Sequence, residues 1–322
     1  MTMLRTFLST CFTALCCAAL PTAALAQQTL PTPVENTRIP VEDVELDGIE
    51  PVRQATGPAL WLVSDEDSRI YLFGTVHALP DGLGWYTETI RTALEGSDTL
   101  MTEIPMQPED DAYLAQYALE AGTLPQGTTL RSLMNTEDLA AYETAMTGFG
   151  LPVETFDSQE PWMAALALSI LPLMQEGYSA DQGVEKKLIA MADDDTAFGA
   201  LETIEYQIGL FDNMPVDDQV DFLLATAGQI DKTFPMMDAM LQEWLAGDPD
   251  GLAQIMNEGL TEDDELTEIL LYNRNANWVD SIADMLAGSG NVFIAVGAGH
   301  LAGPKSVQEL LGQRGIAVTR VQ

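Results

Sequence analysis

The sequence contains two histidines, and each one closes a Gly-x-x-His tetrapeptide that follows an apolar, strand-like run. The tetrapeptides are residues 74–77 and 297–300, which end at His77 and His300. Imidazole is the commonest side-chain metal ligand and the usual proton-transfer group near neutral pH. A single histidine beside a strand is often only a structural residue, but two histidines in matching frames favour a shared functional site. We therefore predict that His77 and His300 are metal ligands.

Two glutamates supply the carboxylates that such a site would need. Two histidines rarely complete a metal site, so further ligands are expected at the ends of neighbouring strands. Glu103 lies in the strand-like run 99–104, and Glu202 follows the run 197–201. Two imidazoles with one or two carboxylates suit a divalent ion such as zinc, manganese or cobalt, whose open position would bind and acidify a water molecule. A helix cap or an ion pair is the alternative role for each glutamate.

The hydrophobic pattern indicates the elements that would position these residues. Apolar runs at both ends of the chain predict a sheet, and apolar residues at three-and-four spacing predict a largely helical middle insert over about residues 108–285. The expected fold is α+β, with a mixed central β-sheet formed by the N- and C-terminal parts of the chain. Strands are expected over residues 59–63, 69–73, 99–104, 197–201, 291–296 and 316–319, and helices over residues 87–94, 112–121, 136–146, 162–175, 184–191, 216–228, 234–246, 265–285 and 304–311.

The first 26 residues have the features of an export signal. They contain a short positive region, an apolar region too short to span a membrane and an Ala-x-Ala cleavage pattern. All three cysteines lie in this segment, so the exported chain is expected to have neither a disulfide nor a thiolate nucleophile. Residues 27–57 are predicted to be a flexible acidic and proline-containing leader, and residues 58–322 a single domain. The periplasm is the expected location, with secretion as the alternative.

The charge of the chain excludes some partners. The sequence has 50 acidic and 13 basic residues and a formal net charge of −37. A surface of this sign repels nucleic acid and anionic lipid headgroups, so no nucleic-acid partner is expected. Beyond the signal, no apolar stretch is long enough to form an integral membrane segment. The acidic residues do not follow the EF-hand pattern either.

Several motifs, in order along the chain, resemble the TraB/PrgY/GumN family and especially its bacterial GumN branch. The resemblance extends from about residue 60 to residue 321. It is carried by Tyr71-Leu72-Phe73-Gly74-Thr75-Val76-His77, Thr102-Glu103-Ile104, Pro161-Trp162, Leu201-Glu202-Thr203 with Gln207, Arg274-Asn275 with Trp278, and Val296-Gly297-Ala298-Gly299-His300-Leu301.

This resemblance implies roles for particular residues. The family includes the Tiki proteins, described as metal-dependent proteases with paired Gly-x-x-His motifs, and its fold is similar to that of erythromycin esterase and ChaN-like proteins. It implies that His77 and His300 are metal or catalytic histidines and that Glu103 and Glu202 are ligands or a general base. By the same resemblance, Arg274 and Asn275 would position a substrate carbonyl or carboxylate. Arg274 and Asn275 are therefore catalytic candidates together with Glu103 and Glu202.

The leading hypothesis is an exported metal-dependent hydrolase that uses metal-activated water, acting on a peptide or protein substrate. The first alternative is a regulatory protein that binds a peptide or similar signal in the same cleft without catalysis. A third possibility is haem binding through His77 or His300, although the sequence has no c-type attachment motif.

Overall fold

The structure is a computed structural model that describes residues 57–257 and 265–322. The predicted signal segment, residues 1–26, and the leader as far as residue 56 lie outside the described residues. Among the described residues, no helix has both the length and the apolar character that a membrane crossing requires.

Six strands form one mixed sheet, in agreement with the predicted fold class. Its order is β4-β3-β5-β2-β1-β6. The pairs β2·β5, β5·β3 and β3·β4 are parallel, whereas β1 runs antiparallel to both β2 and β6. The strands are β1 (Leu60–Ser64), β2 (Ser68–Thr75), β3 (Thr99–Thr102), β4 (Ala197–Ala200), β5 (Gly290–Gly297) and β6 (Val318–Arg320).

Four neighbouring parallel strands end at the same edge of this sheet. Thr75 of β2 lies opposite Gly297 of β5, and Thr102 of β3 lies opposite Ala295 of β5 and Ala200 of β4. The segments that follow the four strands therefore leave the sheet side by side. In open sheets with parallel strands, this carboxyl edge is where ligands usually bind. Each of the four predicted metal ligands follows a different one of these strands.

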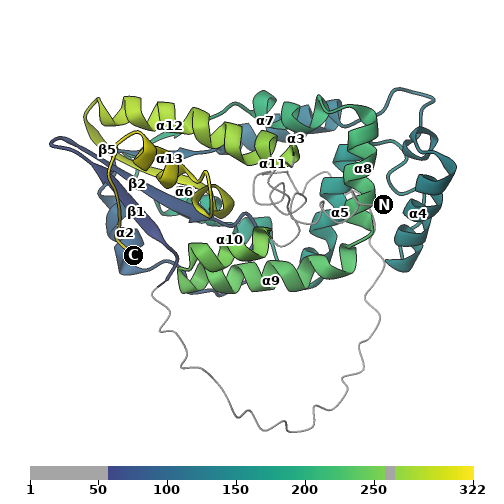
Figure 1. The fold of residues 1–322 in the computed structure, drawn as a ribbon, viewed down its shortest axis with the longest axis horizontal. Helices are drawn as coiled ribbons and strands as arrows, with labels where there is room; N and C mark the ends of the chain where they lie inside the picture. The colour runs from purple at the N-terminus through teal and green to yellow at the C-terminus, as the bar shows by residue number, and fades with distance from the viewer. Residues whose placement is uncertain (1–56, 258–264) are drawn as a thin grey trace, which may run out of the picture.

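Helices cover both faces of the sheet (Figure 1). Alternate residues of β5 pack into different hydrophobic cores, because the side chains of Phe293 and Ile294 lie on opposite faces of the sheet. The face of Ile294 is covered by α12 (Asn273–Leu286) and α13 (Val307–Gln313). The face of Phe293 is covered by α2 (Glu88–Glu95), α6 (Val184–Met191), α9 (Ile230–Ala246) and α10 (Pro249–Asn257).

A second group of helices forms its own core away from the sheet, on the right in Figure 1. Its centre contains Trp162, which stacks on Phe211, which in turn stacks on Phe222. The helices are α3 (Pro108–Ala121), α4 (Thr136–Gly148), α5 (Pro161–Gln175), α7 (Ile204–Asp212) and α8 (Val216–Ala227).

Most predicted elements are present, with three differences. Helices α7 and α10 had not been predicted, and each contains a glycine, Gly209 or Gly251, which weakens the helical pattern. Helix α9 begins at Ile230, before Pro235, because its packed face outweighs the cost of an internal proline. The helix expected over residues 265–285 is divided into α11 (Glu265–Thr267), a π-helix over Glu268–Tyr272, and α12.

The chain that follows β2 is held closely against the segment that precedes α6. Leu79 forms an isolated bridge with Ser179, and the Val184 backbone N–H donates to the Val76 carbonyl at 3.0 Å. A Cβ atom at Gly183 would overlap the His77 carbonyl oxygen and lie 2.9 Å from the Ala180 carbonyl oxygen. Glycine is therefore required here by the close approach of two backbone segments.

We predict that Gly183→Ala lowers the free energy of unfolding by about 1–3 kcal/mol, because the two backbone segments must separate. Urea unfolding measures this change. Gly84→Ala is the control, since a Cβ atom there meets nothing within 4 Å. Equal stability of the two variants would contradict the close packing at Gly183.

Candidate active site at the carboxyl edge of the sheet

A buried arginine lies at the centre of this edge. The Arg274 side chain, from the first turn of α12, is 0% exposed. Its Nη2 donates to Glu103 Oε2 at 2.5 Å and to Glu202 Oε2 at 2.8 Å, and its Nε donates to Glu202 Oε1 at 2.8 Å. Its Nη1 donates to the Leu270 carbonyl at 3.0 Å. One guanidinium therefore joins the ends of β3 and β4 to the start of α12.

The two glutamates have further donors around them. Glu103 Oε1 accepts the Gly297 backbone N–H at 2.7 Å, and Glu103 Oε2 accepts the Gln207 side-chain amide at 2.9 Å. Glu202 Oε1 accepts the Trp278 indole N–H at 2.9 Å. Burial raises the pKa of Glu202 above its ordinary value, although Arg274 acts in the opposite direction, and the neighbouring charge of Glu103 raises it further.

His300 is completely buried beside this cluster. Its Nε2 lies 3.2 Å from Arg274 Nη1, and its Nδ1 lies 2.5 Å from Asn275 Oδ1. The Asn275 side-chain NH₂ donates to the Lys305 carbonyl at 2.9 Å, which turns Oδ1 toward the imidazole. Burial lowers the pKa of His300 well below its ordinary value, and the charges of Arg274 and His77 lower it further. His300 is therefore neutral at physiological pH.

His77 belongs to a different pair. Its Nδ1 lies 2.5 Å from Oε1 of Glu185, a buried residue of α6, and the Thr75 hydroxyl donates to the same oxygen. Burial alone would raise the pKa of Glu185, but the attraction of His77 and the hydrogen bonds from His77 and Thr75 outweigh it and lower that pKa. The His77 side chain is 14% exposed, whereas that of His300 is 0% exposed.

The structure thus gathers five of the six predicted site residues into one network, formed by Glu103, Glu202, Arg274, Asn275 and His300. His77 leaves the sheet at the same edge, but its bonded partner there is a residue that the sequence had not indicated.

Four further side chains take part in these contacts, namely Thr75, Glu185, Gln207 and Trp278. Thr75, Gln207 and Trp278 stand in the motifs of the family resemblance, so a signal for these three was present. Glu185 could have been noticed as an acid beside Val184 on the buried face of a short amphipathic helix.

The side-chain atoms that were expected to bind a metal ion at the carboxyl edge do not fit a metal site in this arrangement. Both oxygens of Glu103 and of Glu202 accept hydrogen bonds, and His300 Nε2 faces a guanidinium. A metal ion bound by these atoms would have to displace Arg274 and leave its charge buried without carboxylate partners. Within residues 57–257 and 265–322, no group of three or more His, Cys, Asp or Glu is placed to hold an ion. The metal ion stays a prediction.

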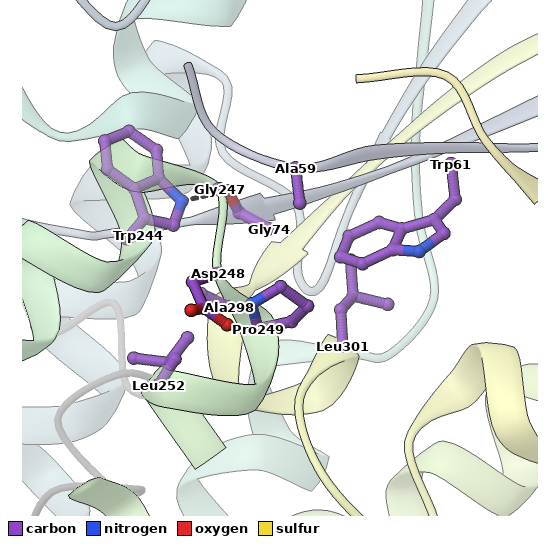
Figure 2. Close-up of a pocket in the computed structure, with 10 residues that line it drawn as sticks. All are labelled: Ala59, Trp61, Gly74, Trp244, Gly247, Asp248, Pro249, Leu252, Ala298 and Leu301. Carbon is purple, nitrogen blue, oxygen red and sulfur yellow. Dashed lines mark hydrogen bonds between the residues drawn. The ribbon is translucent and has the colours of Figure 1, made fainter. Parts of the chain in front are cut away.

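A small apolar pocket is lined in part by residues of both Gly-x-x-His tetrapeptides (Figure 2). Gly74 and Ala298, one from each tetrapeptide, contribute to its wall, and the Trp244 indole N–H donates to the Gly74 carbonyl at 2.8 Å. Its remaining lining residues are Ala59, Trp61, Gly247, Asp248, Pro249, Leu252 and Leu301. Neither histidine is among them, so this pocket is separate from the polar network.

The fold and this edge define a mixed α/β protein with a buried polar network where parallel strands end, the usual place for a ligand site in such sheets. The chain belongs to the TraB/PrgY/gumN family, whose pattern matches residues 59–320. It is also similar to an uncharacterized protein of Treponema pallidum (strain Nichols), with 21% identity over 270 residues, which cover 79% of this chain and 80% of that protein. No solved structure gives a significant match.

The neutral state of His300 leads to a pH-dependent prediction. In the unfolded chain its imidazole takes up a proton below about pH 6.5, whereas in the folded protein it stays neutral, because burial and Arg274 lower its pKa. Protons therefore bind preferentially to the unfolded state, and His300 costs stability as the pH falls. The wild type should lose about 1.4 kcal/mol per pH unit below 6.5 relative to His300→Gln.

Urea unfolding of both proteins between pH 5.5 and 7.5 measures the difference. We expect the destabilisation caused by His300→Gln to be largest at pH 7.5 and to shrink toward pH 5.5. A difference that is constant across this range would show that His300 titrates normally in the folded protein.

Proposed function

We propose that this protein is a hydrolase in which His77 is the general base that activates water, with a peptide bond as the bond that is cleaved. The observation that carries the proposal is the His77–Glu185 pair, in which Nδ1 of a largely buried imidazole lies 2.5 Å from a buried carboxylate oxygen. Membership in the TraB/PrgY/gumN family and the position at the carboxyl edge of parallel strands support it.

The contact of Nδ1 with Glu185 supports a general-base role, because catalytic histidines are commonly oriented by a carboxylate in this way. The lowered pKa of Glu185 keeps it ionised, so it would hold the ring proton on Nδ1 of His77. In the neutral ring Nε2 would then be the proton acceptor, and because this atom is buried, substrate binding would have to bring a water molecule to it. A water molecule would give its proton to Nε2 while its oxygen attacks the carbonyl carbon. Glu185 would stabilise the imidazolium that forms, as the buried carboxylate does in a Ser-His-Asp triad. Breakage of the C–N bond would return this proton to the leaving amine.

Glu103, Glu202 and Arg274 have a positioning role in this proposal. Their charges are engaged with one another, and their side chains are at most 6% exposed. Glu103 accepts the Gly297 backbone N–H and so holds the second Gly-x-x-His tetrapeptide against the end of β3. The proposal therefore differs from the metal-dependent hydrolase expected from the sequence. The carboxylates that were expected to bind the metal ion instead accept hydrogen bonds from the Arg274 guanidinium. It retains the expected export, on the evidence of the signal features in residues 1–26.

The test uses the purified chain with a peptide library, and mass spectrometry detects the cleaved products. We predict that His77→Gln lowers kcat/KM by about 10²–10⁴-fold, because a glutamine side chain accepts no proton at neutral pH. Glu185→Gln should lower kcat more than it raises KM, since it removes the charge that stabilises the imidazolium. Glu120→Gln is the matched control, because Glu120 is an exposed residue of α3.

Full turnover in both variants would contradict the proposal, provided that their unfolding curves match that of the wild type. Metal analysis and turnover after chelation accompany the assay. Stoichiometric metal with loss of turnover on chelation would replace the histidine base with the metal-dependent mechanism. Peptide binding that survives in all variants without any cleavage would instead identify a binding protein.

A further inference from the structure

Lys305 has an unusual backbone conformation close to the polar network. Among the described residues it is the one non-glycine residue with a positive φ, at 55°. It lies in the short segment between His300 and the start of α13. Side chains with a Cβ atom rarely adopt this left-handed conformation, and it persists where surrounding contacts determine it, often at functional sites.

The contacts that hold Lys305 in place come from two directions. Its backbone N–H donates to Glu309 Oε2 at 2.7 Å, so the start of α13 fixes one side. Its Nζ donates to Glu268 and lies 4.3 Å from the centre of the Tyr272 ring. Glu268 and Tyr272 are the two ends of the π-helix that precedes α12. Lys305 therefore spans this irregular turn.

The π-helix directly precedes the residues that reach the site. Turns of π-helix are rare in proteins, and those that do occur are often found at functional sites. Here the Asn273 backbone N–H donates to the Glu268 carbonyl, five residues earlier, and the next two residues are Arg274 and Asn275. Both of these side chains are buried and both lie beside His300. The π-helix therefore sets where Arg274 and Asn275 lie, and these two residues contact the His300 ring.

We infer that Lys305 is a positioning residue that fixes the tautomer of His300 through Asn275. The Lys305 carbonyl accepts from the Asn275 side-chain NH₂ at 2.9 Å, so the amide oxygen must face His300. That oxygen lies 2.5 Å from Nδ1 and requires a proton there. On the other side of the ring, Arg274 Nη1 is a donor and lies 3.2 Å from Nε2, which requires a lone pair there.

Both sides of the ring therefore select the same neutral tautomer, with the proton on Nδ1. The result is a chain of oriented groups from the Lys305 carbonyl through Asn275 and His300 to Arg274. Arg274 in turn holds Glu103 and Glu202 at the ends of β3 and β4. This inference goes beyond the proposed hydrolysis and does not depend on it, because His77 is the base in that reaction.

The test is nitrogen NMR of the imidazoles in the ¹⁵N-labelled full chain, which is practical because the sequence has two histidines. A His300→Gln sample assigns the signals. In the wild type, His300 should show a protonated Nδ1 and an unprotonated Nε2, with a ring N–H proton in slow exchange with water.

Lys305→Val and Lys305→Gly form a matched pair. Both remove the ammonium group, but glycine tolerates a positive φ, whereas a β-branched residue strongly disfavours it. We expect Lys305→Gly to keep the His300 signature. Lys305→Val should give averaged nitrogen shifts and loss of the slowly exchanging proton. Asn275→Leu, which removes the acceptor itself, should lose that proton as well.

Retention of the complete signature in folded Lys305→Val would overturn the inference, and so would equal loss in the valine and glycine variants. If Lys305→Val does not fold, Asn275→Leu decides the matter, since a slowly exchanging Nδ1 proton in that variant would show that the Lys305–Asn275 pair does not fix the ring.

Discussion

The burial of Arg274 is the constraint on which the rest of this edge depends. A guanidinium is always charged, and a buried charge is tolerated only where it is paired and hydrogen-bonded. Here the carboxylates come from the ends of β3 and β4, and the guanidinium comes from α12. Glu103 also accepts hydrogen bonds from the end of β5 and from α7. One buried cation therefore requires strands and helices that are distant in the sequence to meet at one place.

The two histidines of the matching tetrapeptides have different environments. His300 is kept neutral by burial and by the positive charge of Arg274 beside it. His77 faces the ionised Glu185, and its side chain is 14% exposed although both ring nitrogens are buried. The carboxylate of Glu185 would stabilise a positive charge on the His77 ring after proton transfer, whereas burial and Arg274 oppose a positive charge on His300. This contrast is the physical reason to assign proton transfer to His77 and a fixed, oriented role to His300.

Local patterns in the sequence predicted the strands and the edge at which the site lies. The strand β5 is apolar on both faces, and Gly74 and Gly297 mark the ends of β2 and β5, so the positions of His77 and His300 could be read from the sequence. The strand-like runs 99–104 and 197–201 likewise placed Glu103 and Glu202 near strand ends, where the structure has them. Their partner could not be read from local patterns, because Arg274 approaches Glu103 across 171 residues of sequence.

Glu185 and the π-helix were beyond local reasoning as well. A single acid on a short helix gives no sign that a histidine from another strand will meet it. The irregular turn before α12 has the same apolar spacing as an ordinary helix. Its five-residue backbone hydrogen bond and the contacts of Lys305 with both of its ends are seen only in the folded structure. Packing thus decided the features that local propensity leaves open.

A double-mutant cycle between Arg274 and Glu202 tests most directly whether the buried cation organises the site. The cycle compares the free energy of unfolding of the wild type, Arg274→Met, Glu202→Gln and the double variant. Because each single change leaves a partner buried without its counterpart, the two single losses should together exceed the loss in the double variant by about 1–3 kcal/mol. Losses that add within about 0.5 kcal/mol would contradict the account, because the two residues would then stabilise the fold independently.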